Sequence, residues 1–489
     1  MEVPQYVCVF EDKKFSNFFP ISLSRPVFEL RIGFSNLRMR LIDELTPPAH
    51  GVLCREYLSP LMQIEYPDLA VNAEQEHLSS GEGGEEVETL YLNGRLLCYG
   101  EELQSLLEQL PLNALGVKGG YVVAARLAGA AADEFARYIS KRISDEAIER
   151  LCSELKNPRR EDGAGPARAK SGTKESRGAN GGFEDEQEIG KDNVLEQIPQ
   201  ELGRIIDKYS ITRIDMQQAR LLSFTWQIIE ENAAAIEDDF NKLALRGQGD
   251  ESIVFSGVHM VGEENIVIGE AAVIKPGVVL DASTGPIVIG DGTMIMANAT
   301  INGPVYIGKQ CLIKAGAKIF EGTSIGDVCK IGGEVDGTIF SCHSNKQHDG
   351  FMGHSYIGEW VNIGAGTNNS DLKNNYSSVK MWCAGSIRHT GRQFLGLVLG
   401  DHTKTGINTM FNTGTVIGFN CNFFSSEPPD KFVGSYSWGS SGSLERYALE
   451  KAMQTAEVVM ERRSIKFEKA HRDLFQKIFS LAERSGWNI

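Results

Sequence analysis

Residues 287–333 read "IVIGDGTMIMANATINGPVYIGKQCLIKAGAKIFEGTSIGDVCKIGG". Isoleucine occupies every sixth position from Ile289 to Ile331, often beside a glycine. Neither the 3.6-residue period of a helix nor the two-residue period of a strand explains this step. A six-residue step is typical of a parallel β-helix, in which each coil has three short faces and every sixth side chain points inward. The sequence therefore predicts a β-helix.

The same step extends on both sides of this stretch. It is present at Ile268, Ile274 and Leu280 and, after an interruption, at Ile357, Ile363, Met381, Ile387, Leu399, Phe411, Ile417 and Phe423. At about 18 residues per coil, residues 251–427 would form about nine coils. An ordinary β-sandwich is the alternative for a region rich in glycine and isoleucine, but it gives no reason for a step of six.

The rest of the chain differs in pattern from segment to segment. Residues 1–155 mix strand-like and helical runs, which predicts an α/β domain. Residues 156–192 contain almost no large apolar side chains, so we expect a disordered insertion. Residues 193–250 predict a helical connector. Residues 428–489 predict amphipathic helices that cap the last coil or bind a neighbouring subunit.

Composition restricts the partners and the compartment. The formal net charge of −16 argues against nucleic acid or an anionic membrane as the main partner. No stretch approaches the roughly 20 apolar residues of a spanning helix. The nine cysteines form no CxxC motif, which favours reduced thiols. We expect a cytoplasmic protein.

The repeat is interrupted between Ile331 and Ile357 by "FSCHSNKQHDGFMGHS", residues 340–355. We expect a loop there that brings together His343, Lys346, His348, Asp349 and His354. A histidine beside a carboxylate can act as a general base near neutral pH. Two alternatives stay open: the polar residues of a solvent-exposed loop, and a zinc site built from the three imidazoles.

The stretch "HDGFMGHSYIGEWVNIGAGTNNSDLKNNY" resembles the acetyltransferase segment of bifunctional UDP-N-acetylglucosamine pyrophosphorylase/glucosamine-1-phosphate N-acetyltransferases. In that family a histidine precedes the asparagine of "VNIGAGT" by fourteen positions, as His348 precedes Asn362 here. The chain is most similar to the sugar nucleotidyltransferase-like branch. That similarity lies in "LSRPVFELRIGFSNL", "YLNGRLL", "TWQIIEEN", "FLGLVLGDHTKTGINTMFNTGTVIG" and "SWG".

The resemblance implies a left-handed β-helix that forms a homotrimer, with acetyl-CoA and a sugar phosphate bound between subunits. It implies that His348 deprotonates the sugar amine, that Asn362 contacts sugar or acyl group, and that Ala365 and Ser386 lie along the pantetheine. Small residues suit a cofactor arm that runs close to the backbone. Lys404 could meet a CoA phosphate or be a solvated lysine.

The expected sugar-phosphate contacts depart from the family at three positions. Asp336, Phe351 and Asp371 stand where the relatives have lysine, tyrosine and asparagine. The acceptor is then a different sugar, or its phosphate is bound by other lysines. The candidate substrate residues are Lys346, Asp349, Asn362, Asn368, Asn369, Asp371 and Lys373. The asparagines could equally form a structural ladder between coils.

Nucleotidyl transfer requires amides and cations around a triphosphate and carboxylates for Mg²⁺. In the relatives a glycine-rich loop and an arginine bind the phosphates, whereas "VFEDKKFSNFFPISLSRP", residues 9–26, contains no glycine. The candidates for binding UTP or another NTP are Arg25, Arg31, Arg38, Arg40 and Asn93, with Asp12 near the metal. A structural role for "SRPVFELR" is the alternative.

The resulting hypothesis is an enzyme of nucleotide-sugar synthesis of the UDP-N-acetylglucosamine type. It would transfer an acetyl group from acetyl-CoA to an amino-sugar phosphate and a uridylyl group to a sugar-1-phosphate. The alternatives are a zinc-dependent β-helix enzyme and a catalytically silent trimeric scaffold or nucleotide-sugar sensor.

Overall fold

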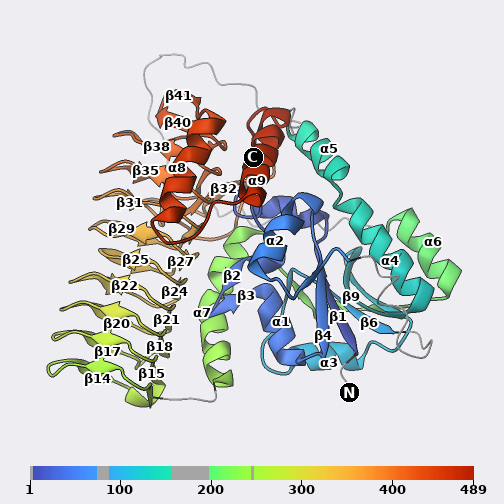
Figure 1. Ribbon diagram of the computed structural model, residues 1–489, viewed down its shortest axis with the longest axis horizontal. Helices are drawn as coiled ribbons and strands as arrows, with labels where there is room; N and C mark the ends of the chain where they lie inside the picture. The colour runs from blue at the N-terminus through green and yellow to red at the C-terminus, as the bar shows by residue number, and fades with distance from the viewer. Residues whose placement is uncertain (1–3, 74–86, 157–197, 244–246) are drawn as a thin grey trace, which may run out of the picture.

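The computed structural model describes residues 4–73, 87–156, 198–243 and 247–489. An α/β domain lies beside a long β-helix, and α7 (Thr225–Lys242) runs between them (Figure 1). Two C-terminal helices, α8 (Leu449–Glu461) and α9 (Lys469–Arg484), lie at the end of the β-helix where the last coils meet the first domain.

The first domain is built on a seven-stranded sheet in the order β10-β8-β9-β6-β1-β4-β5. Its central strand, β1 (Tyr6–Phe10), is fully buried and pairs in parallel with β4 (Ala49–Leu53) and β6 (Glu88–Asn93). The other strands are β5 (Ala70–Val71), β8 (Ala114–Lys118), β9 (Tyr121–Ala128) and β10 (Thr212–Asp215). Open α/β sheets bind ligands at the carboxyl ends of their parallel strands, where the strand order reverses, and β1 is that point here.

Helices and short strands complete this domain. They are η1 (Lys13–Phe18), η2 (Val27–Glu29), β2 (Arg31–Ile32), β3 (Ser35–Asn36), α1 (Leu37–Leu45), η3 (Glu56–Leu58), α2 (Ser59–Glu65), β7 (Leu96–Leu97), α3 (Glu102–Glu108), α4 (Gly129–Arg142), α5 (Asp145–Leu155) and β11 (Arg220–Leu221). The α/β expectation for this part of the chain is confirmed. Apart from Lys156, the described residues begin again only at Ile198, so the expected disordered insertion lies outside them.

The segment expected to be a helical connector is only partly helical. Helix α6 (Gln200–Tyr209) packs on α4, and β10 extends the sheet of the first domain by pairing with β8. The sequence of β10, "TRID", is polar and exposed, which left no strand pattern to detect. Helix α7 is the part of this segment that contacts both halves: the Asn232 side chain accepts from Gly33 N and donates to Gly322 O, each at 2.8 Å.

The β-helix has three parallel faces, as the six-residue step predicts. The first face contains β12 (Gly247–Gln248), β15 (Ile266–Ile268), β18 (Ile287–Ile289), β21 (Val305–Ile307), β24 (Thr323–Ile325), β27 (Ile339–Phe340), β30 (Tyr356–Ile357), β34 (Leu397–Leu399), β37 (Thr415–Ile417) and β39 (Phe432–Val433). The second contains β13 (Ile253–Val254), β16 (Val273–Ile274), β19 (Met294–Ile295), β22 (Leu312–Ile313), β25 (Lys330–Ile331) and β28 (Asn345–Lys346), and further along β35 (Lys404–Thr405), β38 (Asn422–Phe423), β40 (Ser437–Ser440) and the antiparallel β41 (Ser443–Arg446).

The third face completes each coil. It contains β14 (His259–Val261), β17 (Val279–Asp281), β20 (Thr300–Asn302), β23 (Lys318–Ile319), β26 (Glu334–Asp336) and β29 (Phe351–Gly353), followed by β31 (Asn368–Asn369) and β36 (Met410–Phe411). The isoleucines of the repeat from Ile289 to Ile331 are fully or almost fully buried in the interior. They form one continuous apolar core along the β-helix.

The expected loop at the interruption of the repeat is wrong, because residues 334–357 continue the coils with β26 to β30. Their inward side chains include Val335, Phe340, Lys346 and Met352, all buried. Some turns are shorter than six residues, and one inward position holds a lysine, so the six-residue pattern disappears from the sequence although the coil continues.

The chain leaves the β-helix further along, in an antiparallel hairpin formed by β32 (Lys380–Cys383) and β33 (Ser386–His389). Met381 and Ile387 lie on this hairpin and not at inward coil positions, so these two repeat assignments are wrong. The hairpin contacts the first domain, where Cys383 Sγ lies 3.5 Å from Asn17 O. Trp382 stacks on Phe432 with ring centroids 3.9 Å apart.

The C-terminal helices are used within the chain. Helix α9 packs on α5 and α2 of the first domain, and Lys477 forms ion pairs with Asp145 at 2.8 Å and Glu149 at 2.9 Å. This buries an amphipathic surface that the sequence assigned to a cap or to a neighbouring subunit. All nine cysteines are unpaired. Among the described residues, no helix has the length and apolar character needed to cross a membrane.

Candidate functional site

His348 lies on the turn between β28 and β29, and its side chain and that of Asp349 are exposed. Two contacts fix the backbone of this turn. The Lys346 ammonium donates to the carbonyl oxygens of Gly332 and His348, each at 2.9 Å. The Asp349 carbonyl accepts from Gly366 N of the next coil at 2.9 Å. The turn therefore presents an imidazole and a carboxylate to solvent from a well-anchored backbone.

Lys346 differs from its expected role as a phosphate contact. Burial lowers the pKa of its ammonium to about 8, although Asp349 and Glu334 act in the opposite direction. Its side chain points into the β-helix and is 1% exposed. The structure thus gives Lys346 a positioning role beneath His348.

A histidine–carboxylate pair forms, but with different residues from those expected. His354 Nδ1 lies 2.8 Å from Asp371 Oδ2. Burial opposes charge on His354, but the hydrogen bond to Asp371 and the nearby Asp336 outweigh it and raise the pKa. Burial also raises the pKa of Asp336. Asp371 follows His354 by about one coil of chain, so the pair can be found in the sequence only once the coil length is known.

The asparagines of "VNIGAGTNN", residues 361–369, have two kinds of surroundings. Asn368 Oδ1 accepts from Phe351 N at 2.7 Å, and Asn369 Oδ1 accepts from Gly353 N at 2.9 Å. These bonds join successive coils and match the structural ladder. Asn362, in contrast, is exposed and lines a cavity together with Lys404.

The residues expected along the acetyl-CoA arm are separated. The Ala365 carbonyl accepts from Asn408 N at 2.7 Å within the coils. Ser386 is exposed on the β32–β33 hairpin, where its hydroxyl lies 3.4 Å from Cys383 O. Lys373 lies before the same hairpin, and its ammonium donates to Ser378 O. Lys404 donates to His402 O at 2.8 Å, and burial lowers its pKa to about 8.

The three histidines considered for zinc have different neighbours. His343 stacks on Trp360 with ring centroids 4.2 Å apart, His348 is exposed, and His354 pairs with Asp371. Within the part of the chain that is described, no three His, Cys, Asp or Glu side chains are arranged to hold a metal ion. The zinc alternative has no support from this geometry.

The four arginines expected to bind triphosphate all have partners within the protein. Arg25 contacts Asp401 and Glu359, Arg31 contacts Phe34 O and Cys342 Sγ, Arg38 contacts Glu29, and Arg40 contacts Asp238 and Asp239. Arg25 and Arg31 thereby connect the first domain to the β-helix. Nucleotide binding by this set stays a prediction, and it would require these contacts to open.

Asp12 lies at the carboxyl end of β1, where a metal-binding carboxylate is expected. Its Oδ1 accepts from Lys14 N at 3.0 Å and Arg95 Nε at 2.9 Å, and its Oδ2 accepts from Asn93 Nδ2 at 3.0 Å and Arg95 Nη2 at 2.5 Å. Burial would raise the pKa of Asp12, but the charge and hydrogen bonds of Arg95 lower it. A carboxylate has about four acceptor positions. Because all of them are used, Asp12 does not fit a Mg²⁺ ligand in this arrangement.

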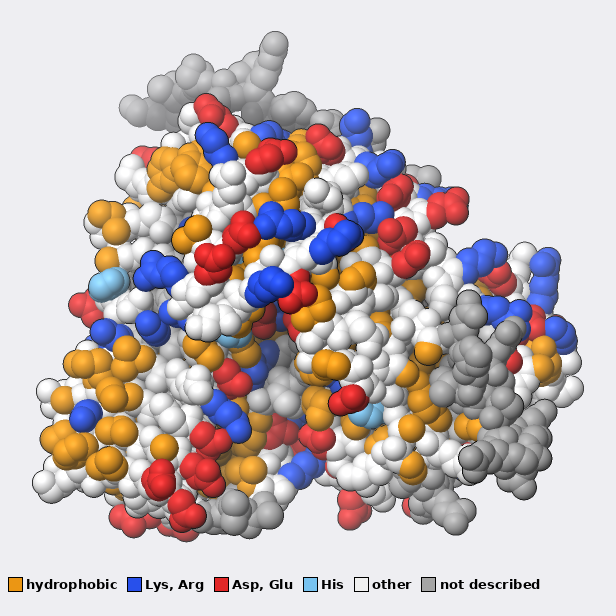
Figure 2. Space-filling model, viewed as in Figure 1, with side chains coloured by type: hydrophobic (Ala, Val, Ile, Leu, Met, Phe, Trp, Pro, Cys, Tyr) orange, Lys and Arg blue, Asp and Glu red, His pale blue; other side chains and the backbone are white. Residues whose placement is uncertain are grey.

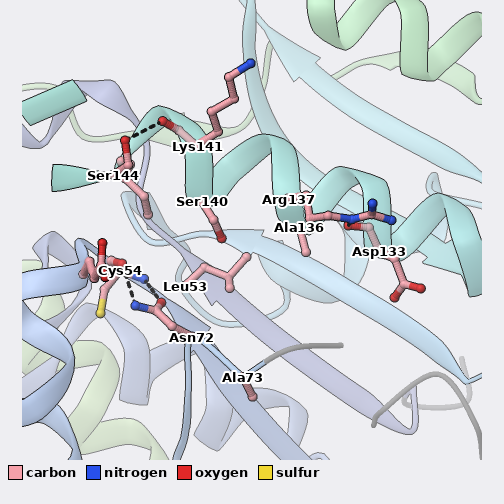
Figure 3. Close-up of a pocket in the computed structure, with 12 residues that line it drawn as sticks. Leu53, Cys54, Asn72, Ala73, Asp133, Ala136, Arg137, Ser140, Lys141 and Ser144 are labelled. Carbon is pink, nitrogen blue, oxygen red and sulfur yellow. Dashed lines mark hydrogen bonds between the residues drawn. The ribbon is translucent and has the colours of Figure 1, made fainter. Parts of the chain in front are cut away.

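The first domain contains a cavity of about 610 Å³ beside the ends of β4 and β5 (Figure 3). Leu53, Cys54 and Asn72 line one side, and α4 contributes Ser140 and Lys141 to the other. A smaller cavity of about 170 Å³ lies beside Asp12 and Lys13. These are the candidate spaces for a nucleotide or sugar in this domain, although neither was detectable from sequence motifs.

An α/β sheet domain joined to a hexapeptide β-helix defines a two-part class of transferase-like proteins. Residues 7–160 match the sugar nucleotidyl transferase family, and residues 286–321 match the bacterial transferase hexapeptide family with six repeats. The chain thus combines a domain that matches the sugar nucleotidyl transferase family with a left-handed parallel β-helix, which confirms the fold and the family resemblance.

Two curated proteins share a segment of this organisation. A bifunctional sugar-1-phosphate nucleotidylyltransferase/acetyltransferase of Sulfurisphaera tokodaii is 37% identical over 91 residues, which cover 18% of this chain and 23% of that protein. The bifunctional protein GlmU of Methanocaldococcus jannaschii is 33% identical over 88 residues, covering 18% and 21%. The chain therefore matches only about a quarter or less of the length of these relatives.

Solved structures of lower similarity include two UDP-N-acetylglucosamine acyltransferases. That of Campylobacter jejuni is 15% identical, with 45% of this chain and 81% of the other covered and a TM-score of 0.26. That of Arabidopsis is 13% identical, with 50% and 92% covered and a TM-score of 0.26.

Proposed function

We propose that the β-helix half transfers an acetyl group from acetyl-CoA to the amine of an amino-sugar phosphate, with His348 as the general base. The observation that supports this proposal is the exposed imidazole on a turn whose backbone is anchored by Lys346 and Gly366. An anchored backbone limits the region that the imidazole can reach, which lowers the entropy cost of bringing base and substrate together.

The proposed reaction is an amide synthesis. The sugar amine attacks the thioester carbonyl and forms the C–N bond, while His348 Nδ1 or Nε2 takes the amine proton. The C–S bond breaks, and the thiolate leaves to be protonated as free CoA. The products are an N-acetylated sugar phosphate and CoA.

We place this chemistry in a cytoplasmic homotrimer with the cleft between subunits. Hydrophobic side chains gather over the first coils of the β-helix (Figure 2). In the first coil, by their positions in or beside β13 and β14, Ile253, Phe255 and Val261 are 50%, 40% and 47% exposed. An exposed apolar surface of this kind is favourable for association of subunits.

For the first domain we propose a second reaction, uridylyl transfer from UTP to the sugar-1-phosphate that the first reaction produces. The match of residues 7–160 to the sugar nucleotidyl transferase family favours it. The Asp12 carboxylate favours the alternative, a catalytically silent scaffold or nucleotide-sugar sensor. Its four hydrogen bonds occupy all of its acceptor positions, and while they persist Asp12 cannot bind the metal ion that uridylyl transfer requires.

The test is a coupled assay of the purified full chain. Glucosamine-1-phosphate and acetyl-CoA are supplied and free thiol is followed; UTP and Mg²⁺ are then added and pyrophosphate is followed. His348→Ala should lower thiol release at least about 100-fold, since general bases contribute about 10²–10⁴. His50→Ala removes a half-buried histidine of β4 in the first domain, outside the β-helix, and should have no effect on thiol release. Equal turnover in His348→Ala and the wild type would show that His348 is not the base.

A further inference from the structure

A polar stripe crosses four successive coils on the outside of the second face. Strand register places Lys330 beside Asn345, Asn345 beside Asn362, and Asn362 beside Lys404. Neighbouring strands are about 4.8 Å apart, so these side chains form a continuous row. The preceding position of the same row is the apolar Leu312, and beyond Lys404 the row continues through Asn422 to Trp438. The four residues from Lys330 to Lys404 therefore belong to a polar row with an apolar residue at each end.

Residues at the end of α8 and just after it line a cavity of about 270 Å³ together with this stripe. In Figure 1, α8 lies against the last coils of the β-helix. Arg462 and Arg463 line it from the helix side, and His343 lines it from the coil side, where it stacks on Trp360. Arg463 Nη2 donates to Asn345 Oδ1 at 3.1 Å, which fixes the helix end over the stripe. We call this space the cationic cavity.

The lining of the cationic cavity contains five basic residues and no acidic one: Lys330, His343, Lys404, Arg462 and Arg463. In the described ranges, none of its lysines and arginines forms an ion pair with a carboxylate. Two carboxylates, Glu359 and Asp327, act to raise the pKa of His343. Glu359 pairs with Arg25 at 3.1 Å, and both carboxylates line a different cavity, which lies between the first domain and the β-helix. Because the whole chain has a net charge of −16, an excess of basic residues is not the reason for this cluster.

The cluster is electrostatically unfavourable when it is empty. Burial lowers the pKa of Lys330, and the charges of Arg463 and Arg462 lower it further. His343 Nδ1 and Arg463 Nε are buried without a hydrogen-bond partner among the described residues. Like charges without a counter-ion are destabilising, and an anion in the cavity would relieve the repulsion among these cations.

We infer that the cationic cavity binds a phosphoryl group, as a phosphate or diphosphate. Arginine and lysine provide the charge-assisted hydrogen bonds that phosphate oxygens accept, and the amides of Asn345 and Asn362 provide neutral donors. The volume lies just below the range of about 300–1,000 Å³ for ligand pockets, which suits a diphosphate or sugar phosphate with the rest of the ligand outside. Phosphate binding itself requires no acyl transfer. Only the identity of the ligand, CoA or a nucleotide sugar, rests on the function proposed above.

The experiment is isothermal titration calorimetry of the full chain with inorganic pyrophosphate, UDP and CoA in separate titrations. Lys330→Gln and Arg462→Gln should each weaken pyrophosphate binding about tenfold, because each removes a charge-assisted contact. The matched control is Lys318→Gln, an exposed lysine of the third face that pairs with Glu334 at 3.4 Å, and it should not change the affinity. UDP and CoA titrations distinguish the two sources of the phosphate.

The outcomes separate this inference from the acyl-transfer proposal. His348→Ala should retain pyrophosphate binding even if it abolishes thiol release. A wild type that releases thiol but does not bind pyrophosphate would refute phosphate binding in the cationic cavity and leave the acyl-transfer proposal intact. No binding by the wild type, or equal losses in the control and the two cavity variants, would overturn the inference. Thermal melting of each variant checks that the fold is retained.

Discussion

Arg25 is predicted to stabilise the contact between the first domain and the β-helix. Its guanidinium contacts Asp401 and lies 3.1 Å from Glu359, and Ser24 donates to Asp401 at 2.5 Å. The side chains of Arg25 and Asp401 are 18% and 4% exposed. Arg25→Met would leave two carboxylates close together without a cation. Removal of one partner from a buried ion pair costs about 3–5 kcal/mol, and because Arg25 and Glu359 are partly exposed we expect a value near 3 kcal/mol.

Urea unfolding followed by circular dichroism measures this loss for Arg25→Met against the wild type. The control is Arg392→Met, since Arg392 pairs with Glu230 at 2.8 Å on the surface with side chains 43% and 41% exposed. Exposed pairs contribute about 0–1 kcal/mol. The variant Arg25→Met/Glu359→Gln/Asp401→Asn should recover most of the loss, because no carboxylate is then unpaired. Equal effects of Arg25→Met and Arg392→Met would refute the interface role.

Two further predictions concern titrating groups near His348. Burial lowers the pKa of Lys346 from 10.5 to about 8, so between these pH values the folded state binds fewer protons than the unfolded state. The free energy of unfolding of the wild type, relative to that of Lys346→Met, should therefore rise by up to about 3 kcal/mol as the pH increases through this window. Urea unfolding at both ends of the window measures the difference, and a pH-independent difference would contradict a buried charged lysine. The raised pKa of His354 should fall in Asp371→Asn and stay unchanged in Asp349→Asn, as ¹³C NMR of labelled histidine can measure. The stability that this pair contributes is present below the ordinary pKa of histidine and is lost as the pH rises through the raised pKa of His354. If Asp371→Asn did not lower the pKa of His354, the pairing would be refuted.

The β-helix was predictable because its core depends on a local repeat. Each inward isoleucine is identified by its position alone, so no knowledge of distant contacts is required. The prediction failed where the local rule fails: Lys346 occupies an inward position, and Met381 and Ile387 keep the spacing on a hairpin that has left the coils.

The candidate site was less predictable because its contacts are distant in the sequence. His354 and Asp371 meet through the stacking of coils. The sequence predicted Arg25 as a phosphate ligand because it shows no nearby partner for this cation. The partner is Asp401, which lies 376 residues further along the chain. The cationic cavity requires Arg462 and Arg463 to approach Lys330, which no sequence pattern records.

The packing of α9 on α5 has a consequence for the synthesis of the protein. Lys477 and Glu149 are separated by 328 residues, so the surface of the first domain that α9 covers stays open until these further residues have been synthesised. At about 5–20 residues per second this takes roughly 15–65 s. During that time the surface of the first domain that α9 covers is exposed to solvent, and the growing β-helix, in which each coil contacts its neighbours, can assemble before the first domain acquires its last helix.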